Sequence, residues 1–184
     1  MTITTIIYVV LGVAFLWLIF TYNRLVRMRF RAKEAISDID VQTKRRYDLI
    51  PNLVETVKGY MQHEKSVLEN VTAARAAVSG GGDAFDKAEK ENILSGTLKT
   101  LFAVAENYPD LKANANFLEL QRELSDTENK IQASRRFYNG TVRDLNTAIQ
   151  TLPTNLIAGI MGFKEMKFFE TGSAAEKEPV KVEF

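Results

Sequence analysis

Five polar side chains lie on or beside the apolar stripes of the expected helices, and their types could support chemistry. Charged groups near a helical core can form an active site, because burial shifts their pKa values. They can equally form a network of ion pairs and hydrogen bonds that fixes the helix register. The second interpretation is favoured, because Glu128 and Arg135 are spaced two turns apart on one helical face. The five residues are Arg75, Glu106, Glu128, Arg135 and Tyr138.

Motifs for metal or nucleophilic chemistry are missing from the sequence. Di-iron helical bundles carry a Glu-x-x-His motif on each of two helices, whereas this chain has one histidine, His63, and no such motif. His63 and Glu64 do not begin an H-E-x-x-H motif, since residue 67 is valine. The chain has no cysteine, which excludes disulfides and thiolate ligands. We therefore expect no catalytic residue, no metal site and no cofactor, and we predict that the protein is not an enzyme.

The N-terminal segment has the composition of a membrane anchor. Residues 1–22 contain no charged side chain, and residues 6–20 are apolar apart from Gly12. A helix of about 20 residues crosses the hydrocarbon core of a bilayer, which is about 30 Å thick. A cleaved signal peptide is the alternative, but it needs a basic start and a small-residue cleavage site, and neither is present. The expected anchor residues are Ile6, Ile7, Leu11, Phe15, Trp17 and Phe20.

A basic cluster follows the apolar segment directly. Five cations lie within residues 24–33, with no acidic residue between them. The positive-inside rule then places the N-terminus outside the cell and the remaining domain in the cytoplasm. These cations could be a solvated helix turn, but contact with anionic lipid headgroups is favoured. The remaining chain has more acidic than basic groups, which argues against nucleic acid as a partner. The cluster consists of Arg24, Arg27, Arg29, Arg31 and Lys33.

Apolar residues recur every three or four positions through most of the chain, which predicts helices. The first stripe begins at Leu25 with no helix breaker before it, so the membrane helix is expected to continue into the domain. The longest stripe runs from Phe117 to Leu152 and is closed by Pro153. No segment alternates with a period of two. The chain is therefore expected to be all-α.

Pro51 interrupts a helical pattern in the stretch RRYDLIPNLVETVKGY, residues 45–60. A proline is tolerated in the first turn of a helix, whereas in a helix interior it costs about 3 kcal/mol. Asp48 is a suitable N-cap, so the favoured interpretation is a corner at which Pro51 opens a second helix running to Val78. A kinked but continuous helix is the alternative.

Short connections between the expected helices favour antiparallel neighbours. The predicted fold is an N-terminal transmembrane helix that continues into an antiparallel up-down four-helix bundle. The expected divisions are an anchor at 1–23, a helical-bundle domain at 24–152, an apolar segment at 153–170 and a flexible tail at 171–184. In this scheme residues 79–83 form a glycine-rich hinge whose Asp83 caps the next helix.

Four blocks of the sequence resemble the LemA family, in the family's order. They are YNRLVRMRFRAKEAISDIDVQTKRRYDLIPNLVETVKGYMQHE, TAARAA, AENYPDLKANANFLELQRELSDTENKIQASRRFYN and PTNLIAGIMGFKEMKFFE. The resemblance covers residues 22–170 and departs at glycines 80–82 and after Phe169. It implies a bacterial membrane protein with an N-terminal anchor, a helical-bundle domain and a short N-terminus outside the cytoplasm. It implies no particular activity.

The segment 152–170 is rich in apolar residues although the last long helix should have ended. It could cap the open end of the bundle, or it could dock on a second copy of the chain or on the membrane interface. The docking residues expected there are Leu156, Ile160, Met161, Phe163, Phe168 and Phe169.

These patterns predict a non-enzymatic membrane-anchored helical protein that associates with copies of itself into a homo-oligomeric scaffold at the membrane. Its partners would be membrane lipids and further copies of the chain. The alternative is a membrane-tethered adaptor or chaperone-like module that recruits a protein partner such as a protease.

Overall fold

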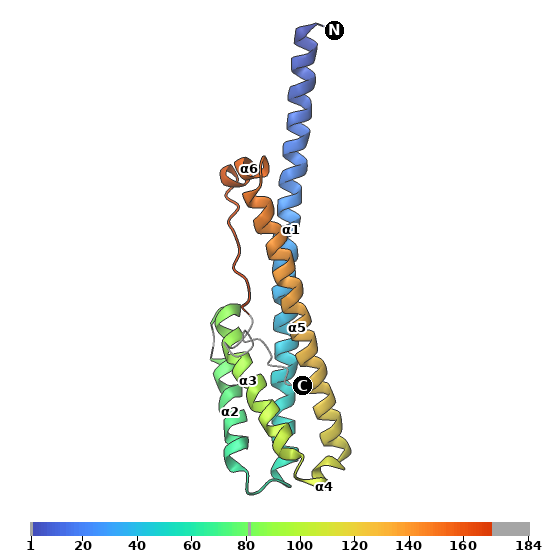
Figure 1. Ribbon diagram of the computed structural model, residues 1–184, viewed down its shortest axis with the longest axis vertical. Coiled ribbons are helices and arrows are strands. Elements are labelled where there is room, and N and C mark those ends of the chain that lie inside the picture. Colours follow the sequence, from blue (N-terminus) through green and yellow to red (C-terminus); the bar gives the residue numbers. More distant parts are fainter. Residues whose placement is uncertain (1, 81, 171–184) are drawn as a thin grey trace, which may run out of the picture. The chain divides into compact units, whose positions relative to one another are not determined.

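The computed structural model describes residues 2–80 and 82–170. Most of these residues are helical and none of them forms a strand, which confirms the all-α prediction. The central glycine of the expected hinge and the whole of the expected tail, 171–184, lie outside the described residues. The helices in chain order are α1 (Ile3–Lys58), α2 (Lys65–Ser79), α3 (Ala84–Ala105), α4 (Pro109–Lys112), α5 (Ala115–Gln150) and α6 (Thr154–Ile160) (Figure 1).

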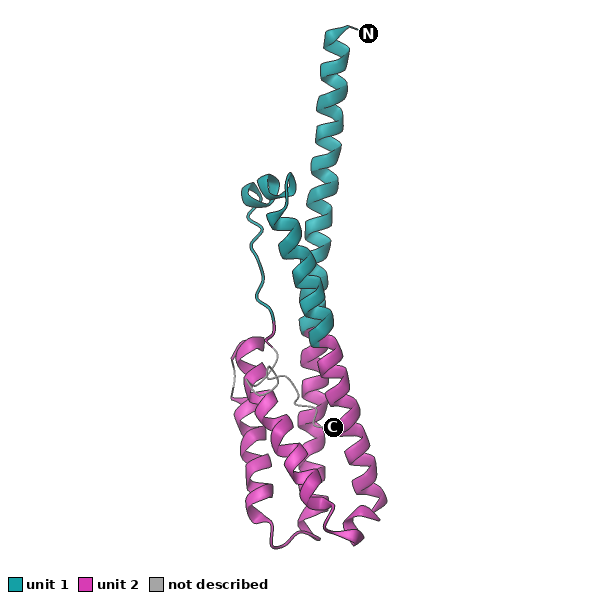
Figure 2. Cartoon of the chain, in the orientation of Figure 1, with its two compact units in different colours: residues 1–36, 135–168 teal, residues 37–134, 169–184 magenta. Residues whose placement is uncertain are grey.

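The chain divides into two compact units, which are coloured in Figure 2. Unit 1 contains residues 1–36 and 135–168, and thus the first part of α1, the last part of α5 and all of α6. Unit 2 contains residues 37–134 together with Phe169 and Glu170 at the end of the described chain. Both α1 and α5 contribute residues to each unit, and each unit has its own packing.

Helix α1 continues without a break from the apolar segment through Pro51. The expected continuation of the membrane helix is therefore confirmed, but the expected corner at Pro51 is wrong. The helix ends instead at Lys58, directly before Gly59, and the next helix begins at Lys65. Consequently, the single helix expected from Pro51 to Val78 is split by a turn at residues 59–64, in which Met61 is buried.

Arg75 explains how the helix passes through Pro51. A proline has no N–H, so the carbonyl oxygen of Tyr47, four residues earlier, loses its intrahelical donor. The Arg75 Nε atom on α2 donates a hydrogen bond of 3.0 Å to this oxygen. The guanidinium also stacks on the Tyr47 ring, with its central carbon 3.7 Å from the ring centroid. A side chain 28 positions away thus replaces the missing backbone donor.

We expect this replacement to appear in a double-mutant cycle. Arg75→Met keeps most of the aliphatic packing but removes the donor, whereas Pro51→Ala restores the backbone N–H. Arg75→Met should therefore destabilise the native chain by about 1 kcal/mol more than it destabilises the chain that carries Pro51→Ala. Urea unfolding of the four detergent-solubilised chains, followed by circular dichroism, measures the coupling. If Arg75→Met lowered the free energy of unfolding equally with and without Pro51→Ala, Arg75 would not be replacing the backbone donor that Pro51 lacks.

The core of unit 2 is formed by the apolar stripes of four helices. Ile50, Leu53 and Val57 of α1 pack with the stripes of α2 and α3, and α5 adds Phe117 and Leu124. The rings of Phe102 and Phe117 meet edge to face, with centroids 6.2 Å apart. Most residues of the expected apolar stripes are therefore buried or partly buried. Leu152, the last member of the stripe expected from Phe117, differs because it is 76% exposed.

Side-chain caps begin two of the helices. Asp83 caps α3 as predicted, since its Oδ1 atom accepts hydrogen bonds from the backbone N–H groups of Phe85 and Asp86. Asn114 caps α5, because its Oδ1 accepts from the N–H of Phe117 at 3.1 Å. Each cap satisfies backbone donors that have no intrahelical partner, and so defines where the helix starts.

Candidate functional site

The N-terminal part of α1 is the one helix among the described residues that is long and apolar enough to cross a membrane. None of its most hydrophobic window is buried in the protein. Exposing such a surface to water is unfavourable by about 25 cal/mol for each Å². A bilayer removes this cost. All six expected anchor residues are exposed: Ile6, Ile7, Leu11, Phe15, Trp17 and Phe20.

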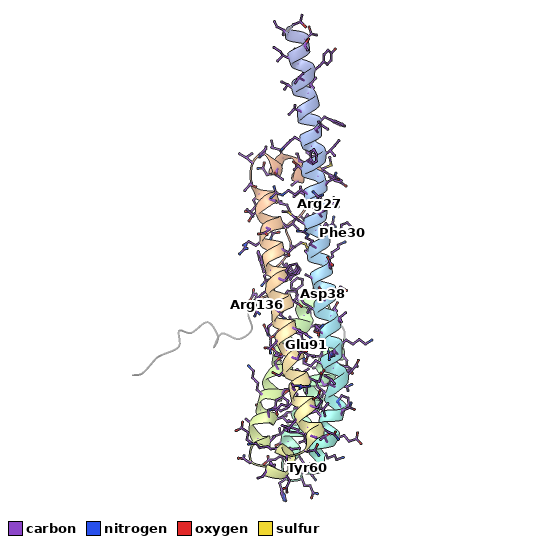
Figure 3. The ribbon with its side chains drawn as sticks, turned by 90° about the vertical axis from the view of Figure 1, so that its right-hand side faces the viewer. Arg27, Phe30, Asp38, Tyr60, Glu91 and Arg136 are labelled. Atoms are coloured by element: carbon purple, nitrogen blue, oxygen red, sulfur yellow. The ribbon has the colours of Figure 1, made fainter. Side chains whose placement is uncertain are left out.

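The basic cluster lies on the part of α1 that follows this segment. All five expected headgroup-contact residues are exposed, namely Arg24, Arg27, Arg29, Arg31 and Lys33. The Lys33 ammonium lies 5.6 Å from the centroid of the Phe30 ring. Figure 3 labels Arg27 and Phe30 on this stretch of α1, at about the level of α6. The cations are therefore available to a ligand or a lipid surface.

Helix α6 belongs to unit 1, and a glycine, Gly162, follows the end of this helix. Gly162 has a φ of +69°, and the N–H of Phe163 bonds the carbonyl of Ala158 at 2.9 Å while that of Gly162 bonds Gly159. This is a Schellman motif, which reverses the chain direction. It brings the Phe163 ring against Tyr22 of α1, with centroids 5.9 Å apart.

One face of α6 packs and the other is exposed. Ala158 joins Leu25, Leu145 and Ala148 in a buried cluster that includes both α1 and α5. Leu156 and Ile160 are 64% and 84% exposed. Three further docking candidates differ from one another: Met161 and Phe168 are exposed, whereas Phe163 is half-buried. The sixth, Phe169, is buried in unit 2, where it stacks on Phe85 with ring centroids 4.7 Å apart.

The segment after α6 is held against α5 by side chains of that helix. The Asn146 amide makes two hydrogen bonds with the backbone of Met166, at 2.9 and 3.0 Å. The Tyr138 hydroxyl donates to the carbonyl of Lys167 at 2.9 Å, and Gln150 bonds Glu165. Tyr138, expected to belong to a polar network in the core, therefore serves to fix the chain that leaves α6.

Alkaline pH should weaken the Tyr138 interaction. Burial raises the pKa of this hydroxyl above its ordinary value of 10.0. The folded state thus holds the proton more tightly, so the stabilisation is complete below pH 10 and declines as the pH rises above it. Tyr138→Phe should cost about 1 kcal/mol at neutral pH, and this difference from the native chain should shrink above pH 10 in urea unfolding. A difference independent of pH would contradict the assignment.

A buried charge cluster lies in unit 2. The Arg46 guanidinium, which is 1% exposed, pairs with the carboxylates of Glu91 and Glu128. Its Nη1 also donates to the Ser95 hydroxyl at 2.7 Å, and that hydroxyl lies 2.8 Å from a Glu128 carboxylate oxygen. Gln132 donates to the other oxygen of Glu128. One cation from α1 is thus shared between carboxylates of α3 and α5, and Figure 3 labels Glu91 among these helices.

The other expected members of a polar network differ from one another in their surroundings. Arg75 contacts Tyr47 as described above, and Glu106 is exposed at the end of α3. Arg135 is buried in unit 1, with 8% of its surface exposed. Of the five expected network residues, Glu128 pairs with Arg46.

Sequence reasoning missed Arg46 and Glu91, although each carries a recognisable signal. Arg46 falls at a stripe position, seven residues after Ile39 and four before Ile50. Glu91 falls three residues before Leu94, on the stripe of α3. A charged residue at an apolar stripe position predicts a buried pair. This cluster is suited to holding three helices together, and within the described residues no group of acidic or histidine side chains could hold a metal ion.

Unit 2 also carries an open groove of about 1090 Å³ between the end of α1 and α2. Its lining includes the apolar side chains of Val54, Met61 and Leu68, and the charged side chains of Lys58, Lys65 and Glu69. This volume is large enough to hold side chains of a bound peptide.

The fold and the exposed N-terminal helix define a helical protein with a candidate membrane anchor. The chain belongs to the LemA family, whose sequence profile matches residues 35–184. It is 29% identical to Protein LemA of Metamycoplasma hominis over 162 residues, which cover 88% of this chain and 73% of that protein. It is 26% identical to the magnetosome protein MamQ of Magnetospirillum gryphiswaldense, over 86% of this chain and 68% of MamQ. Together with the apolar helix, this membership indicates a membrane location.

Proposed function

We propose that this chain is a non-enzymatic, membrane-anchored helical protein that associates with copies of itself into a homo-oligomeric scaffold at the membrane. Residues 1–23 would anchor each copy, and residues 24–152 would form an up-down four-helix bundle in the cytoplasm, with the N-terminus outside. Residues 153–170 would form a docking segment beside the membrane. The scaffold's activity would be to hold many anchors together in one bilayer.

The observation that carries self-association is the exposure of large apolar side chains outside the anchor. Phe30 and Phe137 of unit 1 are 63% and 58% exposed. Val41 and Leu118 of unit 2 are 59% and 50% exposed. Aromatic residues are enriched in the buried centres of interfaces between proteins. Contacts between different faces of identical copies close into rings when the rotation permits it.

Cysteine cross-linking tests this proposal cleanly, because the native chain has no cysteine. We expect Phe30→Cys and Phe137→Cys, combined in one chain, to give a ladder of cross-linked species in membranes treated with a short bis-maleimide. Each single variant should give dimers at most. Asp38→Cys combined with Arg136→Cys is a matched control on the same two helices, at exposed polar positions.

The outcomes separate two functions. A ladder that is specific to the phenylalanine positions supports the scaffold. A single adduct with another protein, without self-linked species, contradicts it and favours a membrane-tethered adaptor that recruits a protein partner such as a protease. The groove beside α2 supports this second function, because its lining combines apolar side chains with charged ones of both signs, as suits an amphipathic peptide.

A further inference from the structure

A pocket of about 420 Å³ lies in unit 1. Its lining includes Arg24, the first charged residue after the apolar segment of α1. Its polar lining comes from three segments that are distant in sequence. Arg24 comes from α1, Arg143 and Thr147 from α5, Thr151 from the turn after α5, and Thr154 from the start of α6. Met28 and Ala148 form its apolar base. The polar lining of the pocket thus consists of two guanidinium groups, three hydroxyl groups and the carboxylate of Asp144.

The charge of the pocket favours an anion. Asp144 is also part of the lining, and its carboxylate lies 3.6 Å from the Arg143 Nε atom. This contact involves Nε, and a guanidinium has four further N–H donors on its Nη atoms. Two cations and one carboxylate leave the pocket with an excess of one positive charge. Each threonine hydroxyl can add one more donor.

The position of the pocket relates it to the bilayer surface. Residues 1–23 contain no charged side chain, and Arg24 is the first charged residue of the chain. The contact between Phe163 and Tyr22 places α6 at this same level of α1. Leu152 and Leu156, beside the pocket threonines, are 76% and 64% exposed. Donors for an anion therefore adjoin apolar side chains at the end of the membrane segment, where phospholipid headgroups lie.

We propose that this pocket binds the phosphate group of a phosphate ester, presented by an anionic phospholipid at the membrane surface. Guanidinium groups bind phosphate oxygens through paired, charge-assisted hydrogen bonds, and hydroxyl donors complete the shell of a tetrahedral anion. The lipid's acyl chains would lie along the exposed apolar surface of α1. The proposal rests on the anchoring part of the proposed function. A free phosphate ester has the same chemistry and is the other source that the test must separate.

The fluorescence of the single tryptophan, Trp17, can measure lipid binding at the pocket. Trp17 lies seven residues before Arg24 on α1, so a lipid held at the pocket brings its acyl chains beside the indole. The full-length chain in neutral detergent is titrated with phosphatidylglycerol brominated on its acyl chains, which quenches Trp17 fluorescence on contact. Brominated phosphatidylcholine serves as the reference without net charge. We expect phosphatidylglycerol to quench at a clearly lower mole fraction.

Arg24→Gln and Arg143→Gln should each weaken phosphatidylglycerol binding by about tenfold and should leave the phosphatidylcholine curve unchanged. Arg27→Gln and Arg136→Gln are matched controls, because they make the same charge change on the same helices outside the pocket lining. Arg136→Gln should bind like the native chain. Arg27→Gln removes one cation of the basic cluster and should weaken binding by clearly less than either pocket variant. All four positions are exposed, and helical circular dichroism of each variant verifies the fold.

Equal weakening by the pocket and the control variants would overturn the proposal and assign binding to the diffuse basic cluster. Competition by millimolar glycerol phosphate or inorganic phosphate, lost in Arg143→Gln, would support the phosphate chemistry and assign a soluble ester as the source. Equal quenching by both lipids would refute the pocket while leaving the anchor intact. No quenching by either lipid would refute the anchoring on which both proposals depend.

Discussion

Arg46→Ala is expected to destabilise the protein by about 3 to 5 kcal/mol. The substitution leaves the Glu91 carboxylate buried without its cation, since the two side chains are 3% and 1% exposed. Glu128, at 28%, is better solvated and keeps hydrogen bonds to Ser95 and Gln132. The free energy of unfolding, measured by urea titration of the full chain in mild detergent, reports the loss.

Arg45→Ala is the matched control for this experiment. Arg45 pairs with Glu123, but their side chains are 45% and 30% exposed, and an exposed pair contributes about 0.2 to 1 kcal/mol. A second variant, Arg46→Met with Glu91→Leu, replaces the buried pair by apolar groups and should recover most of the lost stability. If Arg46→Ala were as mild as Arg45→Ala, the cluster would not be what holds α1, α3 and α5 together.

Removal of residues 1–23 is expected to release the protein from membranes. Residues 3–20 include twelve Leu, Ile, Val and Phe side chains. At about 0.3 to 0.6 kcal/mol each, they favour insertion by about 4 to 7 kcal/mol. Without them the chain should move to the supernatant after membranes are washed with alkaline carbonate. Fractionation followed by immunoblotting measures the two populations.

A chain with residues 3–22 replaced by an unrelated leucine-alanine helix of equal length controls for damage to the rest of the protein. This chimera should return to the membrane fraction. Retention of the truncated chain in carbonate-washed membranes would contradict the anchor and would assign membrane attachment to the remaining residues.

The helical class and most of the core could be predicted because both depend on local spacing. The residues Leu94, Leu98 and Leu101 recur at one helical period and are buried. The Asp83 cap could be predicted for the same reason, since its partners are two and three residues away. Local rules suffice where the interacting groups are neighbours in the chain.

The course of the chain at Pro51 could not be predicted in this way. The local cost of a proline favours a corner, and the compensating donor, Arg75, lies on another helix. The pairing of Glu128 with Arg46 could not be predicted for the same reason, because Arg46 lies on another helix, 82 positions away in the sequence. The apolar helix and the exposed basic cluster could be predicted because both depend on composition, but the pocket that is lined by both Arg24 and Arg143 requires the fold.

The mass of the full-length protein in mild detergent tests the scaffold most directly. Light scattering, corrected for bound detergent, should show a large particle of one discrete size, and single-particle images should show closed symmetry. The chain without residues 1–23, measured alongside, shows whether the anchor or the helical domain holds the copies together. A monomer of 20.8 kDa in both preparations would contradict self-association.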